Sequence, residues 1–182
     1  MWSQKVIEQY ITDQVQENLN LDYKAAGAFS KDSRDREKKI EDISKDVSAM
    51  ANSQGGVIIY GIKEFGGEKR YLPEKIDPID QTIFTKEWLE QIISSNIHRR
   101  IQGVIIHPVQ ITTHPNHCVY AVEIPQSNTA HQAKDKRYYK RYNFESIAME
   151  DYEIRDVMNR ASVPDVNIQF GLFLGSNEPD MN

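Results

Sequence analysis

The sequence has little cysteine and no long apolar run, and these two shortages exclude several classes of protein. Its single cysteine, Cys118, cannot form an internal disulfide, so a reducing, cytosolic setting is expected. Apolar stretches such as residues 57–60 are far too short to span a bilayer, and residues 1–20 are too polar for a secretion signal. We therefore expect a protein that is neither exported nor embedded in a membrane.

The chain also lacks excess positive charge and a glycine-rich phosphate loop. Its formal net charge is -5, so attraction of the whole surface to nucleic acid is excluded and any such contact requires a local basic patch. The glycine pairs at residues 55–56 and 66–67 match neither the dinucleotide-binding pattern nor the P-loop pattern. We interpret the first pair as a helix stop and the second as a turn.

What the chain does have is the composition of one globular domain. Its 182 residues are 39% hydrophobic and 27% charged, which is enough to bury a core without disulfides or a structural metal. The domain is predicted over residues 1–160, and residues 161–182 form a C-terminal tail. Apolar residues at 166–174 predict a further strand there, which is either added to the domain or begins a second domain that the sequence truncates.

The hydrophobic periodicity predicts helices and strands in alternation. Apolar residues at helical spacing indicate helices at 3–16, from Ile40 to about residue 52, at 85–96 and at 147–158. Strands are indicated at 19–24, 57–62, 103–111, 118–124 and 138–142. Residues 26–39 are expected to form a mobile loop that runs into a helix start, and residues 63–67 a turn. This order predicts an α+β domain with one mixed β-sheet packed with helices.

Three acidic residues stand at the edges of these elements. Glu17 closes the first predicted helix, Asp22 points from the polar face of the first strand away from the core, and Glu64 follows the buried strand. If the two strands are neighbours, the carboxylates converge into an oxygen cluster of the kind that binds Mg²⁺ or Mn²⁺ and activates water. The alternative is that they are solvated carboxylates at element ends, which is the usual state of acidic residues.

Residues 134–142 form the densest basic segment, with five cations, one acid and three tyrosines. In a strand, Arg137, Tyr139 and Arg141 share one face, and Lys140 lies on the other. Cations beside rings are what a nucleic-acid surface requires, although a solvated edge strand protected by its charges has the same pattern. Lys24, on the same face as Asp22, either contacts a phosphate or makes an ordinary surface ion pair.

Three motifs, at residues 21–24, 47–64 and 138–141, resemble the Schlafen AlbA_2 family, also called divergent AAA-4 or putative DNA-binding domain. The resemblance covers about residues 8–158 and is to a single-lobed, bacterial-type member. It implies that Glu17, Asp22 and Glu64 occupy the positions of three carboxylates with which the family's nucleases cut tRNA or other structured RNA, using Mg²⁺ or Mn²⁺. The second and third positions carry Asp and Glu where those nucleases tend to carry Glu and Asp, so side-chain reach differs by one methylene at each.

The resemblance also implies partners and alternatives. Vertebrate nucleases of the family build an RNA cradle from two lobes, so a single lobe is expected to act as a homodimer. We expect a nucleic-acid-binding, metal-dependent endoribonuclease. Its predicted catalytic residues and metal ligands are Glu17, Asp22 and Glu64, and its predicted nucleic-acid contacts are Lys24, Arg137, Tyr139, Lys140 and Arg141. The alternatives are a non-catalytic DNA- or RNA-binding module with a regulatory or accessory role, and a protein-interaction domain.

Overall fold

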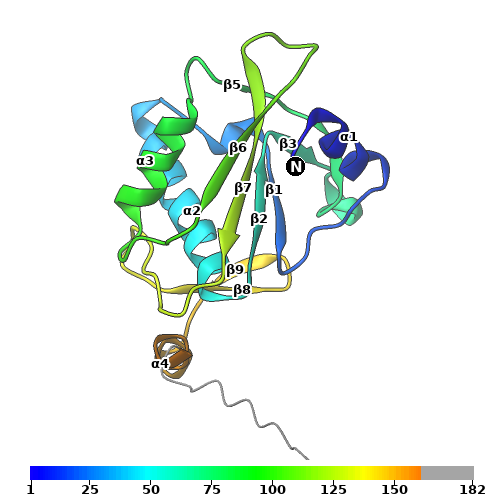
Figure 1. Ribbon diagram of the computed structural model, residues 1–182. Coiled ribbons are helices and arrows are strands. Elements are labelled where there is room, and N and C mark those ends of the chain that lie inside the picture. Colours follow the sequence, from blue (N-terminus) through cyan, green and yellow to red (C-terminus); the bar gives the residue numbers. More distant parts are fainter. Residues whose placement is uncertain (161–182) are drawn as a thin grey trace, which may run out of the picture.

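The apolar run after Gly55 forms the middle of a five-stranded sheet in the computed structural model, which describes residues 1–160 (Figure 1). The strands are β1 (Leu21–Lys24), β2 (Gly55–Tyr60), β5 (Ile79–Asp80), β6 (Ile105–Gln110) and β7 (His117–Pro125). β2 pairs with β1 in parallel and with β7 in antiparallel register. Ile79 and Gln110 both pair with Cys118, so β5 and β6 lie on opposite edges of β7. The α+β class and the mixed sheet are thereby confirmed.

Helices cover both faces of this sheet. α2 (Ser33–Asn52) and α3 (Lys86–Asn96) pack on one face, and α1 (Gln4–Thr12) lies on the other (Figure 1). Ile58 and Tyr60 of β2 belong to the core under α2 and α3, whereas Ile59 belongs to a second core with Ile7 of α1. Because alternate residues of β2 enter different cores, the strand is buried on both faces, as its continuous apolar run predicted.

Two helix boundaries differ from the prediction. α1 ends at Thr12 rather than residue 16, and the left-handed Gln14 (φ 50°) turns the chain away. α2 begins at Ser33, where the side chain of Asp32 caps the helix by accepting from the Arg34 amide. Half of the segment 26–39, which was expected to be a mobile loop running into a helix start, is therefore α-helix, and a 3-10 turn at Ala26–Ala28 precedes it. The first turns of α2 are charged and exposed, so they carry no apolar periodicity to reveal them.

Two separate hairpins complete the domain. β3 (Ile62–Glu64) pairs with β4 (Pro73–Ile76), with a 3-10 turn (Gly67–Lys69) between them, and β8 (Tyr139–Tyr142) pairs with β9 (Glu145–Ala148). Gly61 (φ 103°) breaks the predicted strand 57–62 into β2 and β3, so the predicted turn at 63–67 begins as a strand. The predicted helix at 147–158 is also corrected: Ile147 pairs with Lys140 in the hairpin, and α4 (Asp151–Asn159) follows a capping box of Glu150 and Glu153.

No helix within residues 1–160 combines the length and the apolar character that crossing a membrane requires. The strand predicted at 166–174 lies outside the described residues.

Candidate acidic site and nucleic-acid interface

The parallel pairing of β1 with β2 brings the three predicted acids together. Asp22 lies opposite Ile58 of β2, and β3, which follows β2 directly, carries Glu64. Glu17 shares a side-chain hydrogen bond with Asp22, and the charge of Glu64 is close enough to act on Glu17. Two strands and the segment between α1 and β1 thus contribute to one acidic cluster, defined here as Glu17, Asp22 and Glu64.

Asp22 is fully buried, although it was expected on an open polar face. Hairpin β8–β9 covers that face, and Arg141 of β8 places Nη1 3.1 Å from Asp22 Oδ2, with 1% of each side chain exposed. Lys24 Nζ donates to Asp22 Oδ1 at 2.5 Å. Burial alone raises the pKa of Asp22, but the Lys24 charge, the hydrogen bond from Glu17 and the Arg141 charge outweigh it and lower the pKa. Asp22 is therefore the ionised member of the cluster.

Glu17 lies beyond the end of α1 rather than closing that helix, and it is the protonated member. Its backbone amide donates to the Tyr71 carbonyl at 2.9 Å, and its Oε1 accepts from the Tyr23 amide at 2.6 Å. Burial, together with the hydrogen bond and charge of Asp22, raises the pKa of Glu17 to about 9. At neutral pH Glu17 holds a proton and shares it with Asp22.

Glu64 occupies the most open position of the cluster. It is half-buried at the end of β3, and its Oε1 accepts from the Tyr71 amide at 3.1 Å. Burial raises the pKa of Glu64, and the negative charge of Asp22 acts in the same direction. Tyr71 therefore contacts two of the three acids through its backbone, one through its amide and one through its carbonyl.

The acidic cluster has the ligand atoms that a divalent cation prefers, but not the arrangement of a metal site. Carboxylate oxygens are the ligands that Mg²⁺ and Mn²⁺ prefer, and the shared proton between Glu17 and Asp22 is one that a cation would replace. Within residues 1–160, however, no group of three His, Cys, Asp or Glu side chains is arranged to hold a metal ion. Lys24 and Arg141 already engage both oxygens of Asp22. To bind an ion, Glu17 would have to lose its proton and the Lys24 ammonium would have to leave Asp22.

A cavity of about 430 Å³ adjoins the cluster. Lys24 and Arg141 line it together with Lys39, Lys45 and Asp46 of α2. Asp46 is buried, its Oδ2 lies 3.8 Å from Lys24 Nζ, and its Oδ1 accepts from Ser146 at 2.8 Å. Burial raises the pKa of Asp46. Sequence reasoning missed Asp46, although its position three residues after Ile43, on the apolar stripe of α2, was an available signal.

The basic segment is largely engaged by acids of the same chain. Lys140 pairs with Glu153, and Arg141 is turned inward to Asp22 rather than outward as alternation along an open strand predicted. Tyr139 donates its hydroxyl to Asp135 and is half-buried, while Arg137, which precedes β8, is exposed. Of the five predicted contacts to nucleic acid, Lys24 and Arg141 line the cavity beside the acids, whereas Arg137, Tyr139 and Lys140 lie along the hairpin.

The family model described as Schlafen, AlbA_2 matches residues 17–150. The chain belongs to the Schlafen AlbA_2 family. The matched range begins at Glu17 and includes the whole acidic cluster and the β8–β9 hairpin. Membership of this family suggests a function related to nucleic acid.

Comparison with solved structures supports the fold of this Schlafen AlbA_2 domain. The crystal structure of the DIP2311 protein from Corynebacterium diphtheriae matches with a TM-score of 0.54 and 14% sequence identity. The match covers 84% of this chain and 31% of that chain, so the domain spans less than a third of that protein. At this identity the likeness shows a shared fold alone. No curated protein matches the chain.

The C-terminus of α2 fixes the hairpin of this Schlafen AlbA_2 domain. Asn52 Nδ2 donates to the carbonyls of His131 (2.9 Å) and Tyr139 (2.8 Å), and Asn52 Oδ1 accepts from the His131 amide at 2.7 Å. Ser53 Oγ accepts from the Arg141 amide at 2.8 Å. The sequence was interpreted there only as a helix stop, because nothing in its pattern shows which distant backbone the amide contacts.

Proposed function

We propose that this Schlafen AlbA_2 domain is a cytosolic protein that binds nucleic acid and cleaves RNA, of the tRNA or structured type, with the help of Mg²⁺ or Mn²⁺. The observation that carries the proposal is the convergence of the acidic cluster beside a cavity lined by Lys24 and Arg141. Acids that share a proton, next to cations that can meet a phosphate, are the parts that phosphodiester hydrolysis needs.

In this proposal each residue has a distinct role. Glu17, Asp22 and Glu64 hold the ion, which when bound lowers the pKa of water and stabilises charge on the phosphodiester. Lys24, whose side chain is 30% exposed, exchanges its contact with Asp22 for one with a phosphate oxygen. Arg141 is a positioning residue, because its buried guanidinium fixes Asp22. Arg137, Tyr139 and Lys140 meet the nucleic acid along the hairpin.

A specific observation also favours a second candidate, a non-catalytic DNA- or RNA-binding module. Both oxygens of Asp22 are engaged by cations of the chain itself, and among the described residues no three side chains are arranged as a metal site. In that case the acidic cluster holds the hairpin in place, and binding alone is the function.

We further propose that the domain acts as a homodimer. One copy supplies one acidic cluster and one hairpin, so a groove with binding surfaces on both walls requires a second copy. Light scattering of the purified chain tests this directly, since a monomeric mass at working concentration would remove the dimer from the proposal.

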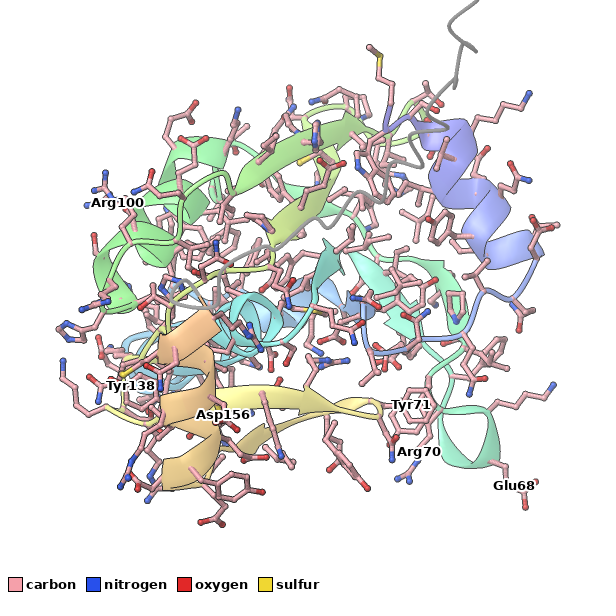
Figure 2. All side chains as sticks on the ribbon, turned by 60° about the horizontal axis from the view of Figure 1, so that its bottom comes forward. Glu68, Arg70, Tyr71, Arg100, Tyr138 and Asp156 are labelled. Carbon is pink, nitrogen blue, oxygen red and sulfur yellow. The ribbon has the colours of Figure 1, made fainter. Side chains whose placement is uncertain are left out.

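Cleavage assays on isosteric variants test the catalytic proposal. Labelled tRNA and duplex DNA are incubated with Mn²⁺ or with EDTA, using the wild type, Glu17→Gln, Asp22→Asn and Glu64→Gln. Amides are chosen because they keep the size and shape of each side chain. At Asp22 even the amide removes the charge that pairs with Lys24 and Arg141, at a cost of about 3–5 kcal/mol for a buried pair, so circular dichroism first checks that Asp22→Asn is folded. The exposed acid Glu68, on the loop between β3 and β4, provides the matched control Glu68→Gln (Figure 2).

The outcomes separate the candidates. Cleavage of tRNA that requires Mn²⁺, falls by about 100-fold or more in each cluster variant and persists in Glu68→Gln supports the nuclease. Binding of either polymer by the wild type without cleavage selects the module. Absence of binding to both at low salt contradicts both candidates.

A further inference from the structure

An aromatic pair lies beside the acidic cluster, at residues that the sequence analysis did not single out. The rings of Tyr71 and Phe144 are stacked, with centroids 4.2 Å apart and planes 18° from parallel. The guanidinium of Arg70 lies 4.9 Å from the Tyr71 ring centroid. Figure 2 shows Arg70 and Tyr71 at the turn end of the β8–β9 hairpin, far from Tyr138 and Asp156 at its other end. We call Tyr71 and Phe144 the aromatic pair.

Tyr71 is held in an unfavourable backbone conformation. Its φ is 74°, in the left-handed region that bulky side chains rarely adopt. Its amide donates to Glu64 and its carbonyl accepts from the Glu17 amide, so both backbone groups are tied to the acidic cluster. The backbone of Tyr71 is therefore tied to the acids, and its ring is held by the stack on Phe144.

The aromatic pair borders a cavity of about 290 Å³. Arg70, Tyr71, Tyr142 and Phe144 line this cavity, together with Asn143 and Glu145. Phe144 also lines the larger cavity that contains Lys24 and Arg141. Phe144 is thus shared by a cavity with aromatic walls and a cavity whose walls carry both cations and acids. A nucleic-acid strand that crosses Phe144 would place a phosphate by Lys24 and a base by Tyr71.

We propose that the aromatic pair is a stacking site for one unpaired base of RNA, next to the phosphate that meets the acidic cluster. This inference rests on the proposed function. It adds that the enzyme selects RNA strands in which the base at the cleaved position is unstacked. Bases in a duplex keep their faces stacked, so only loops, bulges and single strands expose a base face for a protein ring. Phe144 covers one face of the Tyr71 ring and the Arg70 guanidinium lies over the ring, so a base stacks on Tyr71 by replacing that guanidinium, which then meets the phosphate.

Binding of single-stranded RNA in EDTA tests the site without cleavage. Affinity is measured by fluorescence anisotropy for the wild type, Tyr71→Ala, Phe144→Ala and Tyr71→Phe. Removing either ring should weaken binding by about 5- to 100-fold, as expected for loss of one base stack, and Tyr71→Phe should bind within about two-fold of the wild type. The control is Tyr152→Ala, since Tyr152 is a 64% exposed tyrosine of α4 outside this cavity. It should leave affinity unchanged.

A second readout separates stacking from a merely structural effect. RNA carrying 2-aminopurine at successive positions should show a fluorescence change at one position on binding to the wild type and to Tyr71→Phe, and no such change with Tyr71→Ala. If no position responds in the wild type, or if both alanine variants bind as the wild type does, the stacking site is wrong while nucleic-acid binding stands. If the wild type binds no RNA, the proposed function itself fails and the stacking site with it.

Discussion

Glu17 and Asp22 show what burial does to a pair of acids at the scale of single residues. Lys24 and Arg141 keep Asp22 ionised. A second negative charge beside it is unfavourable, and burial adds to this, so Glu17 stays protonated at neutral pH. The two carboxylates thus have different roles despite their contact, one as an anion and one as a hydrogen-bond donor.

We predict that Glu17→Gln stabilises the protein increasingly as pH rises. The pKa of Glu17 is about 9 in the folded chain and near 4.5 in the unfolded chain, so between these values the native state binds one more proton and the free energy of unfolding falls with pH. Glutamine donates the same hydrogen bond without titrating. Relative to the wild type, the variant should gain about 4 kcal/mol between pH 5.5 and pH 8.5 in urea unfolding. Glu68→Gln should show no such trend, and an equal trend in both variants would contradict the assignment.

The sequence could predict some of these residues and not others. The spacing of the motifs predicted which three acids form the cluster. That they would meet depended on the pairing of β1 with β2, which the sequence analysis stated as a condition. Tyr71 had no signal, because its importance comes from contacts with residues 17, 64 and 144, which only the fold brings together. The sequence also could not predict that Arg141 points inward. Alternation along a strand shows which residues share a face, but it does not show that a helix and a second strand cover that face.

At the scale of elements, α2 connects the sheet to the hairpin. Its apolar stripe packs on the sheet through Ile43, Val47 and Met50, and its C-terminal Asn52 holds the backbone of β8. The position of Arg141, and through it that of Asp22, therefore depends on the end of α2.

We predict that Asn52→Ala loosens the hairpin. The substitution leaves the carbonyls of His131 and Tyr139 and the His131 amide without their partner, which should lower the free energy of unfolding by about 2–4 kcal/mol. Hydrogen exchange should accelerate at the amides of β8 more than at those of β2. Asn96→Ala removes only a bond within α3 and serves as the control. Unchanged exchange in β8 would show that α2 does not hold the hairpin.

Elements with an uninterrupted apolar pattern were predicted best. The periodicity located α3 and the β6–β7 hairpin closely, because most of their apolar residues face the core, with Ile105 of β6 as an exposed exception. The periodicity failed at residues 145–158. Strand β9, which pairs with β8, and helix α4 follow each other there, and their apolar residues together resemble the pattern of one helix. The periodicity also failed at the start of α2, which depends on the Asp32 cap rather than on burial.

At the scale of the whole molecule, cations and acids are interleaved around one cavity. Lys24 and Arg141, which pair with Asp22 of the acidic cluster, line it beside Asp42, Asp46 and Glu145, and Phe144 of the aromatic pair borders both this cavity and the smaller one. In a chain with net charge -5, contact with a polyanion therefore depends on these local cations. We propose that Glu17, Asp22 and Glu64 act as one site for a divalent cation.

Titration of Mn²⁺, followed by electron paramagnetic resonance of the free ion, tests that claim most directly. The wild type and Glu68→Gln should bind Mn²⁺ with the same affinity, and binding should release protons and strengthen as pH rises, because Glu17 must lose its proton. Glu17→Gln, Asp22→Asn and Glu64→Gln should each weaken binding by about 10-fold or more. Equal Mn²⁺ binding by the wild type and all three cluster variants would contradict the account.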